Sequence, residues 1–532
     1  MRVPKPTLAA IWLVVPVLLT LLIVWTNSQF PLDFWLHVTS GRWMCETHRL
    51  IAVDTFTHTI SGQQVQNQPW LAQLLMYQTC RLGGYPLVQF AFGAVYGVAI
   101  GLITQLTYRR CRDSRVTAAV MVAAVAVAST NMAIRPQAFS VLLFAAELYV
   151  LCTWGARRFT PWVVAGIELL WSNMHGAFPL GVVLPYIFLI GASGQRVWHG
   201  QRVADQDTAG LRTRLLCCVL ATGAMFVNPQ GLANFKYVSG VASRATERNI
   251  EEWQPTSVEN VAGTAFMLSV AGALLVLGTT RRSTSLTDAL LLASFFVVGV
   301  KSQRMVIWWA LVFPAILAPQ VGLLVQRCSA AGQRIWRAGR DRLARWVPAG
   351  ISPDDSNTRG LFAQLRALAA RIARPRDTQS DTLNWIAAAS LCILLALSTP
   401  WTRPFNPLLP PHKRVAIPYD EPLEAVTFLA SSNYQGRMYQ PMEWGSYVSW
   451  QLDPRVKVFV DSRIDFFPDS VWDDYVSIGT QPDRALATLN RYGVNLVLWD
   501  PRLSRALPAT LDASPEWRRV YSDGKSVVFW RG

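Results

Sequence analysis

Clusters of arginine interrupt a chain that otherwise consists largely of long apolar runs, and this alternation constrains the fold most strongly. An apolar helix of about 20 residues is long enough to cross the hydrocarbon of a bilayer. Short loops rich in Lys and Arg stay on the cytoplasmic side, so each cluster marks a return of the chain to that side. The clusters are Arg109/Arg110/Arg112/Arg115, Arg157/Arg158, Arg196/Arg202/Arg212/Arg214, Arg281/Arg282 and the basic stretch from Arg327 to Arg376.

The apolar runs predict an α-helical polytopic membrane protein with about eleven transmembrane helices. The run at 161–173 is short and carries Glu168, but the arginines on either side of the 161–194 block require an even number of crossings or a re-entrant pair. The expected spans are 8–25, 86–107, 116–133, 138–154, 161–173, 177–194, 214–227, 260–279, 286–301, 305–325 and 383–400.

The net charge of +16 follows from this topology. Residues 401–532 contain 15 Lys and Arg against 15 Asp and Glu, so the whole excess lies within residues 1–400. No aromatic-basic repeat or nucleic-acid motif accompanies the basic residues, so the positive charge does not indicate a nucleic-acid-binding protein.

The order of these features predicts four parts. Residues 1–325 form a transmembrane core whose first outer loop is 26–85, and residues 326–382 form a basic amphipathic cytoplasmic insert. In the insert, 333–347 and 359–374 alternate Arg with apolar residues at helical spacing, which favours helices on anionic lipid over a regulatory or partner site. A last span at 383–400 precedes a soluble domain at 401–532.

The terminal part reads as a small α/β domain because helical and strand patterns alternate along it. The expected helices are 421–431, 443–452, 470–479, 482–493 and 503–513, and the expected strands are 436–440, 456–462, 494–499, 516–521 and 526–530. Eleven crossings from a cytoplasmic N-terminus place this domain outside the cytoplasm, at the outer face of a bacterial inner membrane.

The first outer loop carries the leading candidates for chemistry. If 33–45 is helical, Asp33 and His37 lie one turn apart on the same face, beside a membrane that excludes water. A carboxylate whose pKa is tuned by a histidine or by a second acid such as Asp54 can deprotonate a sugar or alcohol hydroxyl. The structural alternative is a helix cap at Asp33 and a turn at Asp54.

Other polar residues of the predicted outer face supply complementary charge. Arg135, His175, Lys301 and Arg304 could hold a departing lipid-linked phosphate, for which the bidentate fork of arginine is suited. Taken one at a time, Arg135, Lys301 and Arg304 fit interfacial snorkelling better than a ligand role. Together they indicate a site, because acids, amides, histidine and cations gather on one face while the other carries mainly arginine.

Short motifs occur along most of the chain. In the outer loop these are Asp33-x-Trp35-x-His37, Gly41-Arg42, Asp54-x-Phe56, Asn67, Trp70-Leu71-Ala72 and Gly83-Gly84. Farther along they are 171–176, 228–231, Glu252-Trp253, Arg304, 443–447 and 460–463. Together these motifs resemble those of bacterial polytopic proteins grouped with the GT-C glycosyltransferases.

This resemblance implies a membrane glycosyltransferase that moves a sugar from a polyprenyl-phosphate donor to a glycan, lipid or protein acceptor of the cell envelope, at the outer face of the membrane. It assigns the catalytic base to Asp33, with Asp54 second, and His37 or Asp54 would orient or tune the base. Arg135, His175, Lys301 and Arg304 would stabilise the leaving phosphate. Phe34 replaces the Glu that follows the Asp in the protein-mannosyltransferase branch, which leaves the acceptor and the retention of catalysis open.

The terminal domain would cap the cavity and select the acceptor. Trp444, Asp461 and Arg463 are its candidate substrate-binding residues, with turn and strand packing as the alternative. Some GT-C enzymes use a divalent metal and others use none, and no metal ligand is assigned here. Two rival functions are a transporter or flippase of a lipid-linked glycan, and a non-catalytic scaffold for envelope assembly.

Overall fold

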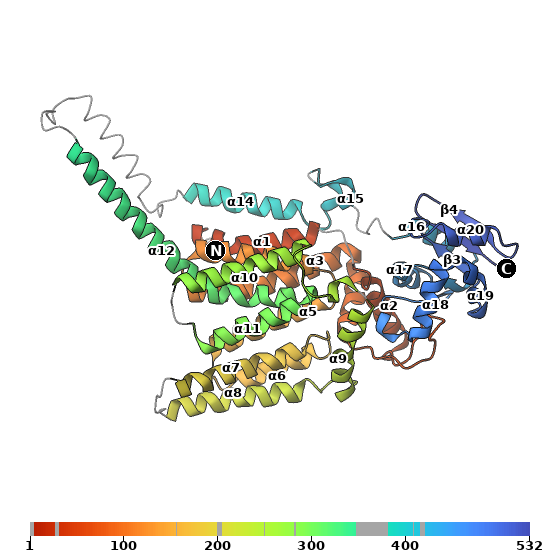
Figure 1. Cartoon of the computed structure of the whole chain (residues 1–532), viewed down its shortest axis with the longest axis horizontal. Helices are drawn as coiled ribbons and strands as arrows, with labels where there is room; N and C mark the ends of the chain where they lie inside the picture. Colours follow the sequence, from red (N-terminus) through yellow and green to blue (C-terminus); the bar gives the residue numbers. More distant parts are fainter. Residues whose placement is uncertain are drawn as a thin grey trace.

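The fold was examined in a computed structural model of the chain. It describes residues 5–26, 31–155, 157–198, 205–248, 250–280, 284–346, 381–407, 409–414 and 421–532. A bundle of long helices lies beside a smaller mixed α/β domain (Figure 1).

The bundle consists of apolar helices that run side by side (Figure 1). Within a bilayer only a structure that satisfies its own backbone hydrogen bonds is stable, and these runs form helices for that reason. The helices are α1 (Leu8–Thr26), α3 (Trp70–Cys111), α4 (Ser114–Ala128), α5 (Gln137–Trp154), α6 (Thr160–Trp171), α7 (Pro179–Trp198), α8 (Asp205–Ala224), α10 (Val261–Thr280), α11 (Leu286–Lys301), α12 (Val306–Trp346) and α14 (Asp381–Leu397).

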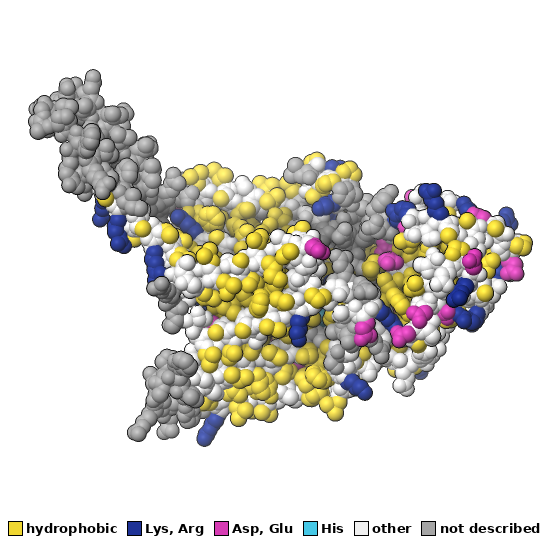
Figure 2. All heavy atoms as spheres, viewed as in Figure 1, with side chains coloured by type: hydrophobic (Ala, Val, Ile, Leu, Met, Phe, Trp, Pro, Cys, Tyr) yellow, Lys and Arg dark blue, Asp and Glu magenta, His cyan; other side chains and the backbone are white. Residues whose placement is uncertain are grey.

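Each of the eleven apolar runs predicted as spans overlaps one of these helices, and the number of spans stays a prediction. Among the described residues, 6 helical segments are long and apolar enough to cross a membrane: α1, α3, α4 with the following turn, α5, α10, and α12 with the preceding turn. Leu268, Leu274 and Leu275 on α10 remain about two-thirds exposed, at 68%, 67% and 66%. Figure 2 shows hydrophobic side chains covering the flank of the bundle, with charges gathered on the terminal domain and at the opposite end. The chain is an integral membrane protein.

The predicted outer loop contains more helix than expected. Helix α2 (Phe34–Thr47) forms where 33–45 was expected to be helical, but α3 already begins at Trp70 and runs through to Cys111. It bends at Gly83 and Gly84, where Gly84 takes a φ of 64° that an L side chain rarely adopts. Residues 70–85 therefore belong to a helix that continues into the bundle, and the irregular part of the loop is shorter than predicted.

The basic insert also differs from its predicted form. Residues 333–346 continue α12 without a break, so the first expected insert helix is an extension of a spanning helix. Its orientation on the membrane surface stays a prediction, and the second expected helix at 359–374 lies outside the described residues.

The terminal domain has the predicted alternation of helices and strands. Its sheet has the order β2-β1-β3-β5-β4, in which β1 pairs in parallel with β2 and β3, and β5 pairs antiparallel with β3 and β4. The strands are β1 (Gly436–Tyr439), β2 (Val456–Val458), β3 (Leu496–Trp499), β4 (Arg518–Ser522) and β5 (Val527–Trp530). The helices are α16 (Leu423–Ser431), α17 (Met442–Leu452), α18 (Asp469–Thr480), α19 (Pro482–Arg491) and α20 (Ala506–Asp512), with the short α15 (Pro411–Arg414) before them.

The outer loop joins this domain to the bundle. Thr57 pairs in parallel with Val458, and the His58 amide donates to the Val458 carbonyl at 3.0 Å, so the loop lies along the β2 edge of the sheet. Helix α17 packs on α2, where the Trp35 and Tyr447 rings lie 4.9 Å apart in an edge contact. The residues of α2 are thus fixed between the membrane bundle and the terminal domain.

Candidate active site

Asp33 and His37 form the centre of the candidate site, at the start of α2. One turn of helix separates them, and His37 Nε2 lies 3.5 Å from Asp33 Oδ2. Asp33 occupies the N-cap position but makes no capping hydrogen bond through its side chain, which contradicts the simple capping alternative. Its Oδ1 atom is buried and has no hydrogen-bond partner among the described residues. A buried carboxylate oxygen in this condition is uncommon and is available to a substrate.

A series of amides fixes the orientation of His37. The Gln73 side chain on α3 approaches His37 Nδ1 through Nε2 at 3.3 Å, and its Oε1 accepts a hydrogen bond from Asn67 Nδ2 at 2.7 Å. Because Gln73 donates to Nδ1, a neutral His37 carries its proton on Nε2, the atom that faces Asp33. Little in the sequence points to Gln73, a polar residue in a helical run.

Two arginines and one glutamate surround this pair. Arg135, in the turn before α5, donates to Glu252 through Nη2 at 2.8 Å and Nη1 at 3.3 Å. Arg304 pairs with the same carboxylate from the 3-10 turn Gln303–Met305, and its guanidinium lies 5.0 Å from the centre of the Trp253 ring. The Glu252 carboxylate therefore pairs with two cations, and Arg135, Arg304 and Glu252 together carry a formal net charge of +1.

The arginines act electrostatically on Asp33. Burial alone opposes its ionisation, but the contact with His37 and the positive charges of Arg135 and Arg304 outweigh burial and hold the pKa of Asp33 well below its usual range. Burial likewise opposes the ionisation of Glu252, and the same two arginines hold its pKa below the usual value. Both carboxylates are ionised at neutral pH.

His175 joins the site from the turn between α6 and α7. The Trp171 indole donates to Ser140 Oγ at 2.6 Å, and that hydroxyl lies 2.8 Å from His175 Nδ1, which also accepts from the Ala177 amide at 3.2 Å. These contacts assign the proton of a neutral ring to Nε2. Burial, followed by the charges of Arg304 and Arg135, lowers the pKa of His175, so the ring is neutral. It can donate one hydrogen bond without adding charge.

The remaining predicted residues lie elsewhere. Lys301 is exposed at the end of α11 and makes no ion pair among the described residues. Asp54, Asp461 and Arg463 form a second cluster, in which Arg463 bridges the two carboxylates while Asp54 Oδ2 accepts from the Thr57 amide at 3.0 Å and hydroxyl at 2.7 Å. The Asp54 side chain thus makes the turn contacts of its structural alternative. Trp444 is buried in α17, at 5% exposure, within the hydrophobic core.

A divalent metal does not fit the residues around Asp33. No group of three or more His, Cys, Asp or Glu side chains with a suitable arrangement occurs in the described part of the chain. The second carboxylate near Asp33 already pairs with two arginines, whose positive charge repels a cation. The cluster therefore offers a carboxylate that can accept a proton, beside two arginines that can attract an anion.

Comparison with known proteins gives structural matches but no sequence matches. Neither a family model nor a curated protein matches the sequence. Arabinofuranosyltransferase AftD from Mycobacteria superposes with a TM-score of 0.51 at 14% identity, over 99% of this chain and 42% of that chain. This chain therefore spans less than half the length of that enzyme.

Two further structures superpose less closely. Archaeal oligosaccharyltransferase AglB from Archaeoglobus fulgidus gives a TM-score of 0.49 at 13% identity, over 98% of this chain and 74% of that chain. ArnT from Cupriavidus metallidurans, solved with undecaprenyl phosphate, gives 0.47 at 14% identity, over 97% and 96%. The superposition with AftD shows a shared fold, so the chain has the fold of that arabinofuranosyltransferase.

Proposed function

We propose that this protein is a membrane glycosyltransferase that transfers a sugar from a polyprenyl-phosphate donor to an acceptor of the cell envelope. One observation carries the proposal: a buried carboxylate oxygen of Asp33, without a hydrogen-bond partner among the described residues, lies under the influence of two arginines that share one glutamate. Such a site can accept a proton at one point and hold a phosphate at another. The GT-C fold agrees with this function but does not by itself establish it.

In the proposed reaction Asp33 takes the proton of the acceptor hydroxyl. The acceptor oxygen forms a bond to the anomeric carbon of the sugar, and the bond from that carbon to the phosphate oxygen breaks, leaving its electron pair on the lipid phosphate. Arg135 and Arg304 stabilise this developing charge, an effect of about 3–4 kcal/mol for a well-placed donor. His175, which is neutral, donates a further hydrogen bond.

The charges of the site balance through the reaction. Asp33 loses its negative charge when it accepts the proton, while the departing phosphate gains one, so the arginines face the same total charge throughout. The low pKa of Asp33 keeps it ionised before the donor binds. An arriving phosphate partly neutralises the arginines and thereby raises the proton affinity of Asp33 when the reaction needs it.

The other candidate residues take different roles in this proposal, and Trp444 packs in the hydrophobic core. Because Arg463 and Thr57 occupy the Asp54 carboxylate, we assign the Asp54–Asp461–Arg463 cluster to docking of the terminal domain rather than to proton transfer. Lys301, exposed beside Arg304, is assigned to attraction of the anionic head group. We place this site and the terminal domain at the outer face of the bacterial inner membrane and the N-terminus in the cytoplasm, on the arginine distribution alone.

The test is the Asp33→Asn substitution, measured by release of undecaprenyl phosphate from synthetic undecaprenyl-phosphate hexoses and pentoses in membranes. We expect a loss of about 10²–10⁴-fold, the usual contribution of a general base. Asp113→Asn is the matched control, because Asp113 caps α4 through bonds to the Arg115 and Val116 amides, which asparagine can also accept. Undiminished release by well-expressed Asp33→Asn protein would remove Asp33 as the base.

A transporter of lipid-linked glycans is the second candidate. Glu147 on α5 and Glu168 on α6 are buried and close enough to interact electrostatically, and none of their carboxylate oxygens has a hydrogen-bond partner among the described residues. Acidic residues in membrane helices often belong to transport pathways. Movement of a fluorescent undecaprenyl-phosphate sugar across vesicles that stops in the Glu147→Gln/Glu168→Gln variant, without sugar transfer, would favour this function.

A further inference from the structure

A pocket of about 380 Å³ lies where α9 (Leu232–Glu247) meets the terminal domain. Helix α9 supplies Lys236, Tyr237 and Gly240, while Asp465 and Phe466 come from the short turn Ile464–Phe466 of the terminal domain. The volume falls within the range of about 300–1,000 Å³ that is typical of small-molecule sites. It is separate from the Asp33 cluster and has no role in the reaction described so far.

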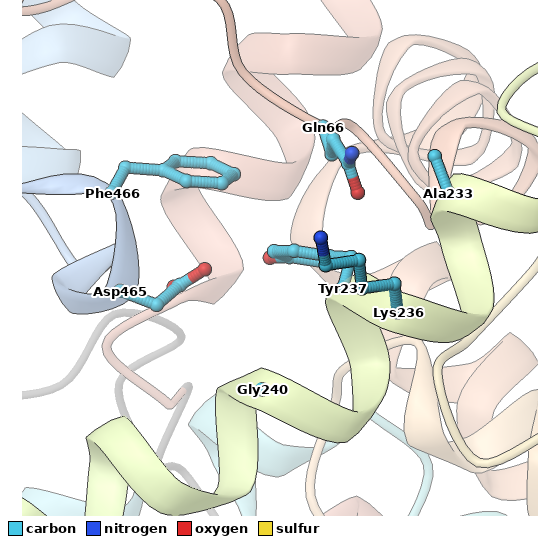
Figure 3. Close-up of a pocket in the computed structure, with 7 residues that line it drawn as sticks. All are labelled: Gln66, Ala233, Lys236, Tyr237, Gly240, Asp465 and Phe466. Atoms are coloured by element: carbon cyan, nitrogen blue, oxygen red, sulfur yellow. The ribbon is translucent and has the colours of Figure 1, made fainter.

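Two aromatic rings from different parts of the molecule form one aromatic side of the pocket. Figure 3 shows the Tyr237 and Phe466 rings next to each other in the pocket lining. Their centroids lie 5.8 Å apart and their planes differ by 24°, so the rings stack on each other and no sugar ring fits between them. The surface of the stack that faces the pocket suits the C–H face of a pyranose or furanose ring, which is apolar although its edge is polar.

Polar groups surround these rings. Figure 3 shows the Asp465 carboxylate directed toward Tyr237 and the Gln66 amide above it. The Oε1 atom of Gln66 is buried and has no hydrogen-bond partner among the described residues. A carboxylate, an amide and the Lys236 ammonium together offer both acceptors and donors, which is what adjacent hydroxyl groups require.

The pocket is linked to the candidate base through residues of the outer loop and α3. Gln66 precedes Asn67, whose side chain donates to Gln73, and Gln73 in turn contacts His37. A short hydrogen-bonded path therefore leads from the pocket wall to the histidine beside Asp33. On the other wall, Arg248 at the end of α9 donates to the Phe467 carbonyl and to Asp469, both at 2.8 Å, and so fixes α9 against the terminal domain.

We infer that this pocket binds a saccharide and, resting on the proposed function, that it is the subsite for a glycan acceptor. The stacked rings of Tyr237 and Phe466 would pack against one face of a sugar ring, and Gln66, Lys236 and Asp465 would bind its hydroxyl groups. Of the three acceptor classes, glycan, lipid and protein, a subsite of this kind selects the glycan. The terminal domain then takes part in acceptor selection through Asp465 and Phe466.

Filling the pocket tests this assignment. Gly240 lines the pocket and a Cβ atom built on it meets nothing within 4 Å, so Gly240→Leu adds bulk to the lining without a clash at Cβ. Gly223 on α8 has equally open surroundings and lies outside the pocket, which makes Gly223→Leu the matched control. A second variant, Asp465→Asn, removes charge while keeping the shape of the side chain.

Binding is measured by saturation-transfer NMR on the full chain in nanodiscs, with methyl glycosides of glucose, galactose, mannose, rhamnose and arabinofuranose as probes. We expect at least one glycoside to bind, with a loss of about tenfold or more in Gly240→Leu and a smaller loss in Asp465→Asn, because a filled pocket loses its contacts outright. Gly223→Leu should bind as the wild type does.

Failure of this inference differs from failure of the proposed function. Absence of binding by every glycoside, or unchanged binding in Gly240→Leu, would overturn the saccharide pocket whatever the transfer assay shows. Undiminished sugar transfer by Asp33→Asn together with binding that Gly240→Leu abolishes would keep the saccharide pocket and remove the mechanism.

Discussion

Arg463 holds the outer loop against the terminal domain, and its replacement by methionine predicts a defined local loosening. Its guanidinium bridges Asp461 and Asp54, whose side chains are 1% and 0% exposed. In Arg463→Met these two carboxylates remain buried and lose their shared cation. Methionine retains much of the apolar stem, so the effect reports on the lost charge more than on lost packing.

The structure sets the size of the effect. Removing one partner of a buried ion pair costs about 3–5 kcal/mol. Asp54 keeps its bonds from the Thr57 amide and hydroxyl, so we expect the lower end, about 3 kcal/mol, which corresponds to about a hundredfold change in a local opening equilibrium. Asp461→Asn added to Arg463→Met should recover part of this loss, because only one uncompensated carboxylate then remains.

Hydrogen exchange measures this opening at the contact itself. The His58 amide donates to the Val458 carbonyl, so its exchange reports on separation of the loop from the sheet. We expect exchange of the peptide containing His58 to accelerate about a hundredfold in Arg463→Met, whereas Arg518→Met, on an exposed position of β4, leaves it unchanged. Exchange within about threefold of wild type would refute the reasoning from buried charge.

Two further predictions concern the candidate base and its support. His37→Gln should raise the pKa of Asp33, because it weakens the contact that favours the ionised carboxylate. The acid limb of the pH profile of sugar transfer then moves to higher pH. An unmoved acid limb would show that His37 does not tune the pKa of Asp33. Gly41→Ala should clearly lower the melting temperature of the protein, because a Cβ atom on Gly41 would lie 2.2 Å from the Gln73 carbonyl oxygen. Gly223→Ala should leave the melting temperature unchanged, because a Cβ atom there meets nothing within 4 Å. Equal melting temperatures of the two variants in detergent would show that α2 shifts freely on α3.

The sequence predicted the elements that depend on local patterns. Apolar runs and arginine clusters located the bundle helices, and alternating periodicities located the helices and strands of the terminal domain. Asp33 and His37 were expected on one helical face because four residues make about one turn, and they lie in contact. Each of these inferences uses residues that are close in the chain.

Long-range pairing could not be read in the same way. Arg135 and Glu252 are 117 residues apart, and Arg304 reaches the same carboxylate across 52 residues. The sequence indicated that acids and cations share one face, but nothing in it specifies which carboxylate neutralises which arginine. The path from Asn67 through Gln73 to His37 was hidden for the same reason, because an amide in an amphipathic helix has no distinctive pattern.

Hydrogen-bond saturation separates the two aspartates that the sequence offered as first and second candidates for the base. Asp54 has both carboxylate oxygens engaged, one by Arg463 and the other by Thr57, so a proton could reach it only after a contact is broken. Asp33 has one oxygen near His37 and the other buried without a partner among the described residues. Burying such an atom costs about 1–3 kcal/mol unless a ligand satisfies it. A site that bears this cost in the resting state gains it back when an acceptor hydroxyl binds, and that difference between the two aspartates is why the base is assigned to Asp33.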